Sequence, residues 1–262
     1  MKNYFKLALL GLLTLSLFSA CDKPEKESDE IPEIEMVYVE GGEFQMGATA
    51  EQGDDAYLGE WPVRTVRLDS YYIGKYEVTQ AQWKAVMGEN LSYFKGDGNP
   101  VERVLWEEAQ RFCEKLSAKT GKKYVLPTEA QWEYAARGGK KSKGYKYAGS
   151  NTLSEVAWYR DNSCALGEDD PDYGTHAVGT KKANELGIYD MSGNVYEWCS
   201  DWYADYDESD TDNPAGPQIG SRHVARGGSW YDAASYGRVS CRCNTIPGIR
   251  TNDRGFRVAM IP

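Results

Sequence analysis

Histidine is scarce in this sequence, with only His176 and His223 among 262 residues. Metal centres that need several imidazole ligands are therefore excluded. A basic stripe is also lacking, and the excess of acidic residues gives a net charge of −10, which disfavours nucleic acid as a partner and suits cations better. The sequence is instead rich in aromatic residues and glycine, with 8 Trp, 19 Tyr and 27 Gly. This composition predicts an irregular, loop-rich fold with a core of large rings.

The N-terminus carries an apolar run, residues 7–18, that is too short for a comfortable membrane-spanning helix. Lys2 and Lys6 precede the run, and Ser19, Ala20 and Cys21 follow it. This arrangement resembles a bacterial lipoprotein signal over residues 1–20, in which Cys21 becomes the lipidated N-terminus. An ordinary cleaved secretory signal is the alternative. In either case the chain leaves the cytoplasm, and the first interpretation predicts a membrane-anchored lipoprotein of the cell envelope, periplasmic or surface-exposed.

Residues 21–35 are charged, contain two prolines and have no aromatic side chain. A segment of this composition cannot bury enough apolar surface to offset the entropy of ordering it, so we expect a flexible tether. The remaining residues, 36–262, are enough for one hydrophobic core and too few to require two. We therefore expect a single domain after the tether.

Five cysteines follow Cys21, and their odd number makes a complete disulfide framework a poor expectation. Cys241 and Cys243 alternate along a predicted strand, so their side chains would point the same way. A metal pair there is disfavoured because neighbouring histidines are missing. The five are Cys113, Cys164, Cys199, Cys241 and Cys243.

The spacing of apolar residues, together with capping and breaking residues, predicts short helices and strands in the first half of the domain. Strands are expected over residues 36–39, 42–46 and 64–73. Helices are expected over residues 80–87, with Thr79 as the N-cap and Gly88 at the end, 106–120, stopped by Gly121, and 130–136. Short strands and polar, glycine-rich loops should make up the rest.

A tight turn at residues 192–194 lies between an apolar and an aromatic stretch and has carboxylates on both sides. Asp190, Glu197 and the carbonyls of Gly193 and Val195 could converge on a hard cation such as calcium. A hairpin turn whose acids face water is the alternative, since the dedicated twelve-residue calcium loop pattern is absent.

Six motifs, taken together, resemble the formylglycine-generating enzyme, or sulfatase-modifying-factor, superfamily. They are MVYVEGGEFQMG (36–47), YEVTQAQW (76–83), VLPTEAQWEYAARGG (125–139), NELGIYDMSGNVYEWCSDW (184–202), RGGSW (226–230) and DRGFRVA (253–259). The resemblance covers essentially the whole domain. It implies an α+β fold of the C-type-lectin-like kind, loop-rich with short strands and few helices. It also implies a structural calcium held by the side chains of Asp190 and Glu197 and the carbonyls of Gly193 and Val195.

The resemblance does not extend to the catalytic cysteines. In the enzymes, two copper-binding cysteines stand two and seven residues after the aromatic residue of the GGS-aromatic motif. Here those positions are Asp232 and Gly237, which cannot supply a thiolate. Cys241 and Cys243 have a different spacing and would need a shifted alignment between two anchored motifs. Copper is therefore an unlikely cofactor, and the iron-dependent branch needs a histidine-rich domain that two histidines cannot supply.

Residues 231–254 instead resemble the variable proteins of diversity-generating retroelements, which display a hypervariable ligand surface on this fold. Lys, Glu, Gln, Met and Trp, which randomised AAC codons cannot encode, are absent from this segment. An ordinary surface loop of biased composition is the alternative. We expect Arg238, Arg242 and Arg250 to be structural. The predicted ligand-binding positions are Tyr231, Asp232, Tyr236, Gly237, Cys241, Cys243, Ile246, Ile249, Thr251 and Asp253.

Three functional classes follow. The favoured one is a noncatalytic envelope lipoprotein that binds a partner protein or surface ligand and is attached to the membrane through Cys21. The second is a copper-dependent oxidase that generates formylglycine in exported sulfatases, and the third is a structural component of an envelope assembly.

Overall fold

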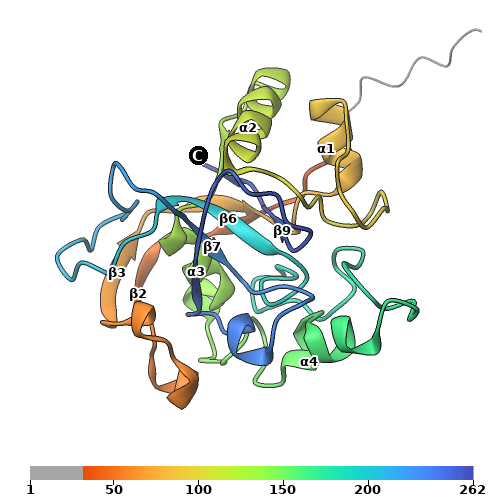
Figure 1. Ribbon diagram of the computed structural model, residues 1–262. Helices are drawn as coiled ribbons and strands as arrows, with labels where there is room; N and C mark the ends of the chain where they lie inside the picture. The colour runs from red at the N-terminus through yellow and green to blue at the C-terminus, as the bar shows by residue number, and fades with distance from the viewer. Residues whose placement is uncertain (1–31, 262) are drawn as a thin grey trace, which may run out of the picture.

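The computed structural model describes residues 32–261, which form a mixed fold of short strands, a few helices and long loops (Figure 1). The predicted signal, Cys21 and most of the predicted tether lie outside these residues. Among residues 32–261, no helix has both the length and the apolar character needed to cross a membrane.

The first sheet joins the two ends of the domain. Its antiparallel order is β1-β4-β10-β5, so the last strand of the chain lies between two strands from the first half. The strands are β1 (Met36–Val39), β4 (Tyr71–Gly74), β5 (Tyr124–Val125) and β10 (Ala259–Met260). A separate hairpin pairs β2 (Gly42–Met46) with β3 (Arg64–Leu68).

The other four-stranded sheet, in the order β8-β7-β6-β9, carries the turn and the C-terminal segment. Only the β6 and β9 pair is parallel. The strands are β6 (Tyr196–Trp202), β7 (His223–Arg226), β8 (Arg242–Thr245) and β9 (Arg254–Gly255).

The α-helices are α1 (Gln80–Met87), α2 (Trp106–Thr120), α3 (Glu129–Ala136) and α4 (Leu153–Val156). Helices α1 and α2 pack together at the top of Figure 1, whereas α3 contacts both the β2–β3 hairpin and strands β6 and β7. Short 3-10 turns complete the regular structure: η1 (Ala50–Asp55), η2 (Leu58–Glu60), η3 (Gly139–Lys141), η4 (Arg160–Asn162), η5 (Cys164–Leu166) and η6 (Ala234–Gly237).

The helix predictions are confirmed, and the physical reason is capping. At α1 the Thr79 hydroxyl accepts from the backbone N–H of Gln82 at 3.3 Å, and the Gln82 side chain accepts from the N–H of Thr79 at 3.0 Å. Gly88 ends this helix with a φ of 94°, a left-handed conformation that glycine adopts without steric cost. Helix α3 begins one residue before the predicted start, because Thr128 is its N-cap.

The prediction of one strand over residues 64–73 is wrong. The chain breaks at Asp69 and Ser70 and passes from the β2–β3 hairpin to the first sheet. Val66 and Leu68 are buried before the break and Tyr71 and Ile73 after it, so the alternation shifts by one residue at the break. The consecutive apolar residues 71–73 fit either phase, so the pattern alone does not locate the shift. The Ser70 hydroxyl accepts from the N–H of Gly41 at 3.0 Å and holds the two corners together.

Large rings fill the core, as the composition predicts. One buried cluster centres on Trp132, Tyr134 and Tyr71. A second contains Trp83, which stacks on Phe112 with ring centroids 5.6 Å apart, and Phe256. This packing fixes the surfaces from which the long loops emerge.

Candidate functional site

Three arginines tie the C-terminal segment, residues 231–254, to the first half of the chain. Arg238 donates to both oxygens of Glu60, each at 2.6 Å. Arg242 donates to both oxygens of Glu129, and Arg250 to both oxygens of Glu108. The expectation that these arginines are structural is confirmed. Bidentate pairs of this kind are geometrically specific, so the path of the segment is well defined.

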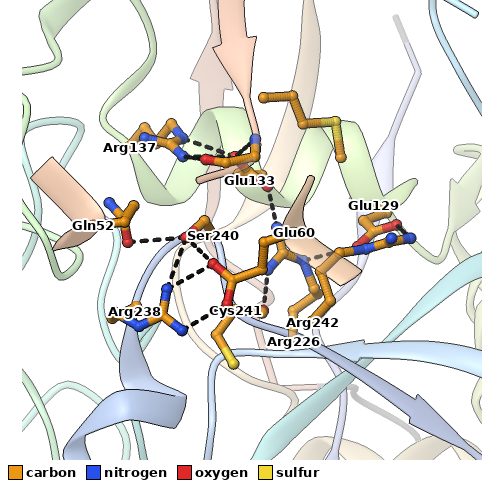
Figure 2. A network of polar contacts seen from close by, with 12 residues as sticks. Gln52, Glu60, Glu129, Glu133, Arg137, Arg226, Arg238, Ser240, Cys241 and Arg242 are labelled. Carbon is orange, nitrogen blue, oxygen red and sulfur yellow. Dashed lines mark hydrogen bonds and ion pairs between the residues drawn. The ribbon is translucent and has the colours of Figure 1, made fainter. Parts of the chain in front are cut away.

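Figure 2 shows that two of these pairs belong to a larger buried network. The Ser240 hydroxyl contacts Glu60 and the Gln52 side chain, and the Arg226 guanidinium contacts Glu133 and the carbonyl of Cys241. Burial pushes the pKa of Glu60 up, but hydrogen bonds from Arg238 and Ser240 outweigh it and hold the pKa below its usual value. Glu60 is therefore held as a carboxylate.

Most of the predicted ligand-binding residues of the segment reach solvent. Tyr231 is 58% exposed and Tyr236 is 37% exposed. Ile246 and Ile249 are also exposed, and the remaining half-buried positions are Asp232, Cys243, Thr251 and Asp253. The structure thus gives the segment arginine anchors that are buried or half-buried, with accessible side chains before, between and after them.

Two of the predicted ligand-binding residues, Gly237 and Cys241, are buried, so that part of the prediction is wrong. Gly237 ends η6 against α4, where a Cβ atom would lie 3.0 Å from Leu153 Cδ1. Cys241 is 2% exposed because it lies inside the network of Figure 2, where its carbonyl accepts from Arg226. Neither residue can reach a ligand on the surface.

The positions of the enzyme-type cysteines have a different chemistry here. The Asp232 carboxylate accepts from the Ser229 hydroxyl, and burial raises the pKa of Asp232 to about 6. Among the nearby thiols, burial raises the pKa of Cys241 to about 12 and also raises the pKa of Cys243. Thiolates, the form that binds copper(I), are disfavoured at both cysteines.

The turn at residues 190–197 brings backbone and acid groups into the interior. Asp190, Gly193 and Asn194 have φ values of 59°, 82° and 59°, which fold the chain back tightly. Asp190 Oδ2 accepts from the N–H of Gly179 at 2.7 Å, while its Oδ1 is buried and has no partner. An unpartnered buried carboxylate oxygen is the kind of atom that a cation would satisfy.

Glu197, the other predicted calcium ligand, already has partners. Both of its oxygens accept from Arg257 at 2.6 Å, and Oε2 also accepts from Trp132 Nε1 at 2.7 Å. Across residues 32–261, no three His, Cys, Asp or Glu side chains converge as a metal site. A calcium ion would therefore depend on Asp190, on the carbonyls of Gly193 and Val195, and on the remaining lone pairs of Glu197.

Glu77 is a member of this cluster that the sequence analysis missed. Its carboxylate accepts from the Asn194 side chain at 2.7 Å and from the N–H of Val195 at 3.1 Å. Burial, and then the charges of Asp190 and Glu197, raise the pKa of Glu77. Its position in the YEVT motif was the sequence signal that could have identified it. Asp190, Glu197 and Glu77 are thus three buried carboxyl groups near Arg257, and burial also raises the pKa of Asp190, to about 6.

Comparison with known proteins places this geometry in a family. Residues 22–261 match the family described as sulfatase-modifying factor enzyme 1-like domain. The chain belongs to the sulfatase-modifying factor family. It is 36% identical to the chaperone protein LppX of Paenibacillus barcinonensis, over 86% of this chain and 88% of that protein. It is 31% identical to the formylglycine-generating enzyme of Thermomonospora curvata, over 92% of this chain and 98% of that enzyme.

Solved structures agree with the family assignment. Variable protein 1 of Treponema denticola superposes with a TM-score of 0.76 at 36% identity, covering 87% of this chain and 95% of that one. The predicted loop-rich fold of the formylglycine-generating enzymes is therefore confirmed. Within the sulfatase-modifying factor family, this chain is similar both to enzymes and to proteins with other names. The function of this chain must therefore be inferred from its own residues.

Proposed function

We propose that this member of the sulfatase-modifying factor family is a noncatalytic binding protein of the cell envelope. The observation that carries the proposal is the identity of the two positions used by the enzymes, Asp232 and Gly237. Gly237 is also buried and packed against Leu153, so a larger side chain at this position would require Leu153 to move. A partner protein or surface ligand would contact the exposed side chains of residues 231–254.

The rigidity of the segment supports a role in binding. Its arginine anchors are buried or half-buried and paired, so the exposed positions can change without disturbing the backbone. A loop that is ordered before binding loses less conformational entropy when the partner arrives. Tyr231 and Tyr236 suit such a face, because tyrosine offers a large contact area with few rotatable bonds.

Retroelement diversification is a finer proposal for the same segment. The similarity to Treponema denticola variable protein 1 supports it, as does the absence of Lys, Glu, Gln, Met and Trp from residues 231–254. Sequencing the DNA downstream of the gene tests it. A near-copy of the codons for residues 227–257 that differs at adenines, beside a reverse transcriptase, is expected. If no such repeat is present, the segment is a fixed binding loop.

Two further parts of the proposal concern the membrane anchor of the domain and the stability of its fold. Cys21 would carry the lipid that anchors the protein in the cell envelope. A structural calcium would bind Asp190, Glu197 and the carbonyls of Gly193 and Val195, where it would offset the excess of buried acid. Its contribution is to stabilise the scaffold, not to take part in a reaction.

The similarity to the Thermomonospora enzyme favours one competing function, a copper-dependent oxidase. Incubating the protein with copper, oxygen and a sulfatase-type cysteine peptide, followed by mass spectrometry, separates the two. We expect no formylglycine. If the wild type forms formylglycine and Cys241→Ser does not, the noncatalytic proposal is overturned. Cys164→Ser is the control: formylglycine formation that survives in this variant would show that the effect is specific to Cys241.

A further inference from the structure

Two groups of tyrosines lie on either side of Asp232 and define what we call the tyrosine face. On one side, the buried ring of Trp230 contacts Phe94, Tyr173 and Tyr231, with ring centroids 4.9, 5.1 and 5.5 Å away. Tyr93 extends this group through Phe94, at 4.9 Å, and is 61% exposed. Three tyrosines from three separate loops thus share one accessible surface.

The second group comes from η6 and from the residue before η2. The rings of Tyr57 and Tyr236 lie 5.5 Å apart, and both are exposed. The Tyr57 hydroxyl also hydrogen-bonds to Ser235 Oγ at 3.1 Å. In Figure 1, the blue turn that carries Tyr236 lies at the lower centre beside α4. These contacts hold the second pair of rings in place.

Asp232 connects the two groups. The Tyr57 hydroxyl, then burial, and then the charge of Asp232 raise the pKa of Tyr236. On the other side, burial and then Asp232 raise the pKa of Cys164, a residue that also lies near Tyr173. Asp232 also lies between the two groups along the chain, directly after Tyr231 and two residues before η6, and its carboxylate accepts from the hydroxyl of Ser229, the residue before Trp230.

The surroundings of the face are acidic. Glu168 lies beside Tyr173 on an exposed loop, and Asp169 and Asp172 on that loop are also exposed. The neighbouring arginines already have partners. Arg160 pairs with Asp161 at 3.4 Å, and Arg254 lies 4.0 Å from Asp253 and over the buried Trp198 ring at 5.0 Å. Arg238, which pairs with Glu60, lies over the Tyr57 ring at 5.5 Å, so one face of that ring already contacts a cation. The net charge of the whole chain, −10, is also negative.

We propose that the tyrosine face binds arginine or lysine side chains of a protein partner. The faces of tyrosine rings attract cations, and a carboxylate between them supplies a charged hydrogen-bond acceptor. Acidic surroundings speed the approach of a basic partner and discourage an acidic one. This inference rests on the proposed binding function and specifies the chemistry of its partner.

The test measures the affinity of the full chain for a short peptide of alternating serine and arginine by isothermal titration calorimetry. The same peptide with citrulline in place of arginine is the neutral counterpart. We expect the arginine peptide to bind at least about tenfold more tightly, and the difference to shrink at high salt. Equal affinity for the two peptides, or no binding of the arginine peptide, would overturn the inference.

Variants identify the surface and the interaction. Asp232→Asn and Tyr231→Leu should each weaken arginine-peptide binding by about tenfold, whereas Tyr231→Phe should retain it because the aromatic face remains. The matched controls are Tyr38→Leu, an exposed tyrosine on β1, and Glu114→Gln, an exposed acid on α2. If the controls weaken binding as much as Asp232→Asn and Tyr231→Leu do, the peptide is binding to the acidic surface in general and the inference is wrong.

Failure of this inference is distinguishable from failure of the proposed function. Binding of the citrulline peptide that Tyr231→Leu abolishes would keep the binding function and reject the cationic partner. Oxidation of a cysteine peptide in the copper assay would reject the binding function itself.

Discussion

Asp201 is a buried carboxyl group whose two hydrogen-bond donors are neutral. Its Oδ2 accepts from the N–H of Glu129 and from the Ser200 hydroxyl, both at 2.9 Å. Burial, and then the charge of Glu129, raise the pKa of Asp201 to about 7, from an ordinary value of 3.8. The folded protein therefore keeps this proton over a range of pH in which the unfolded chain has lost it.

The stabilisation linked to Asp201 is present below about pH 4 and is lost as the pH rises through about 7. The side chain of Asp201→Asn stays neutral, so its free energy of unfolding should fall less than that of the wild type between about pH 4 and pH 7. The difference between the two falls should be up to roughly 4 kcal/mol. Urea unfolding at pH 4.5 and pH 8 measures the difference. Asp97→Asn, at an exposed acid, is the control. Parallel pH profiles for the wild type and Asp201→Asn would contradict the prediction.

Asp190 provides the sharpest test of the proposed calcium. Within residues 32–261 it makes no ion pair, whereas removal of Glu197 would leave Arg257 buried and without its charge partner. A chelator should lower the melting temperature of the wild type by several degrees, because it removes the bound ion. The melting temperature of Asp190→Ala should be almost unchanged by the chelator. Differential scanning calorimetry measures both, with Glu114→Gln as the control. An equal response of the wild type and Asp190→Ala to the chelator would exclude this site.

At the scale of single residues, the sequence predicted which acids surround the turn but not what they contact. Glu197 meets Arg257, which is 60 residues away, and Asn194 meets Glu77, which is 117 residues away. Neither pairing has a local periodic signal. The burial of Cys241 was missed for the same reason, because the Arg226 side chain that holds its carbonyl belongs to a different strand.

At the scale of elements, the Arg238–Glu60 pair joins the C-terminal segment to η2. Both side chains are buried, so Arg238→Ala would leave a carboxylate without its charge partner. We expect a loss of about 3–5 kcal/mol in the free energy of unfolding. Arg222→Ala, at an exposed arginine, should change it by less than about 0.5 kcal/mol.

Denaturant unfolding measures this prediction, and hydrogen exchange shows where the loss occurs. Faster exchange in residues 231–241 of Arg238→Ala is expected if the pair holds the segment. A change in stability no larger than that of Arg222→Ala would show that the pair does not anchor it.

Helices were the elements best predicted from the sequence. Capping residues such as Thr79 and Gly121 act within one turn, so their effect is local and visible in the sequence. Strands depend on partners that are distant in the chain, which explains why the break between β3 and β4 was not found. The 3-10 turn η6 was likewise not predicted, because it is packed against α4 from another part of the chain.

At the scale of the whole molecule, the proposed lipid on Cys21 would determine where the domain is held. If it is lipidated, the protein should partition into the detergent phase of a Triton X-114 extraction, and Cys21→Ser should move it to the aqueous phase. Cys164→Ser is the matched control. Aqueous partitioning of the wild type would contradict the lipoprotein prediction and favour an ordinary secretory signal.

The position of β10 bears on when this chain can fold. Because Ala259–Met260 pairs with both β4 and β5, the first sheet stays divided until β10 is in place. Contacts between such distant segments form slowly, since a long stretch of chain must be ordered before they can be made. Closure of the first sheet is therefore expected to be a late and slow step in folding, after the segments between its strands have been ordered.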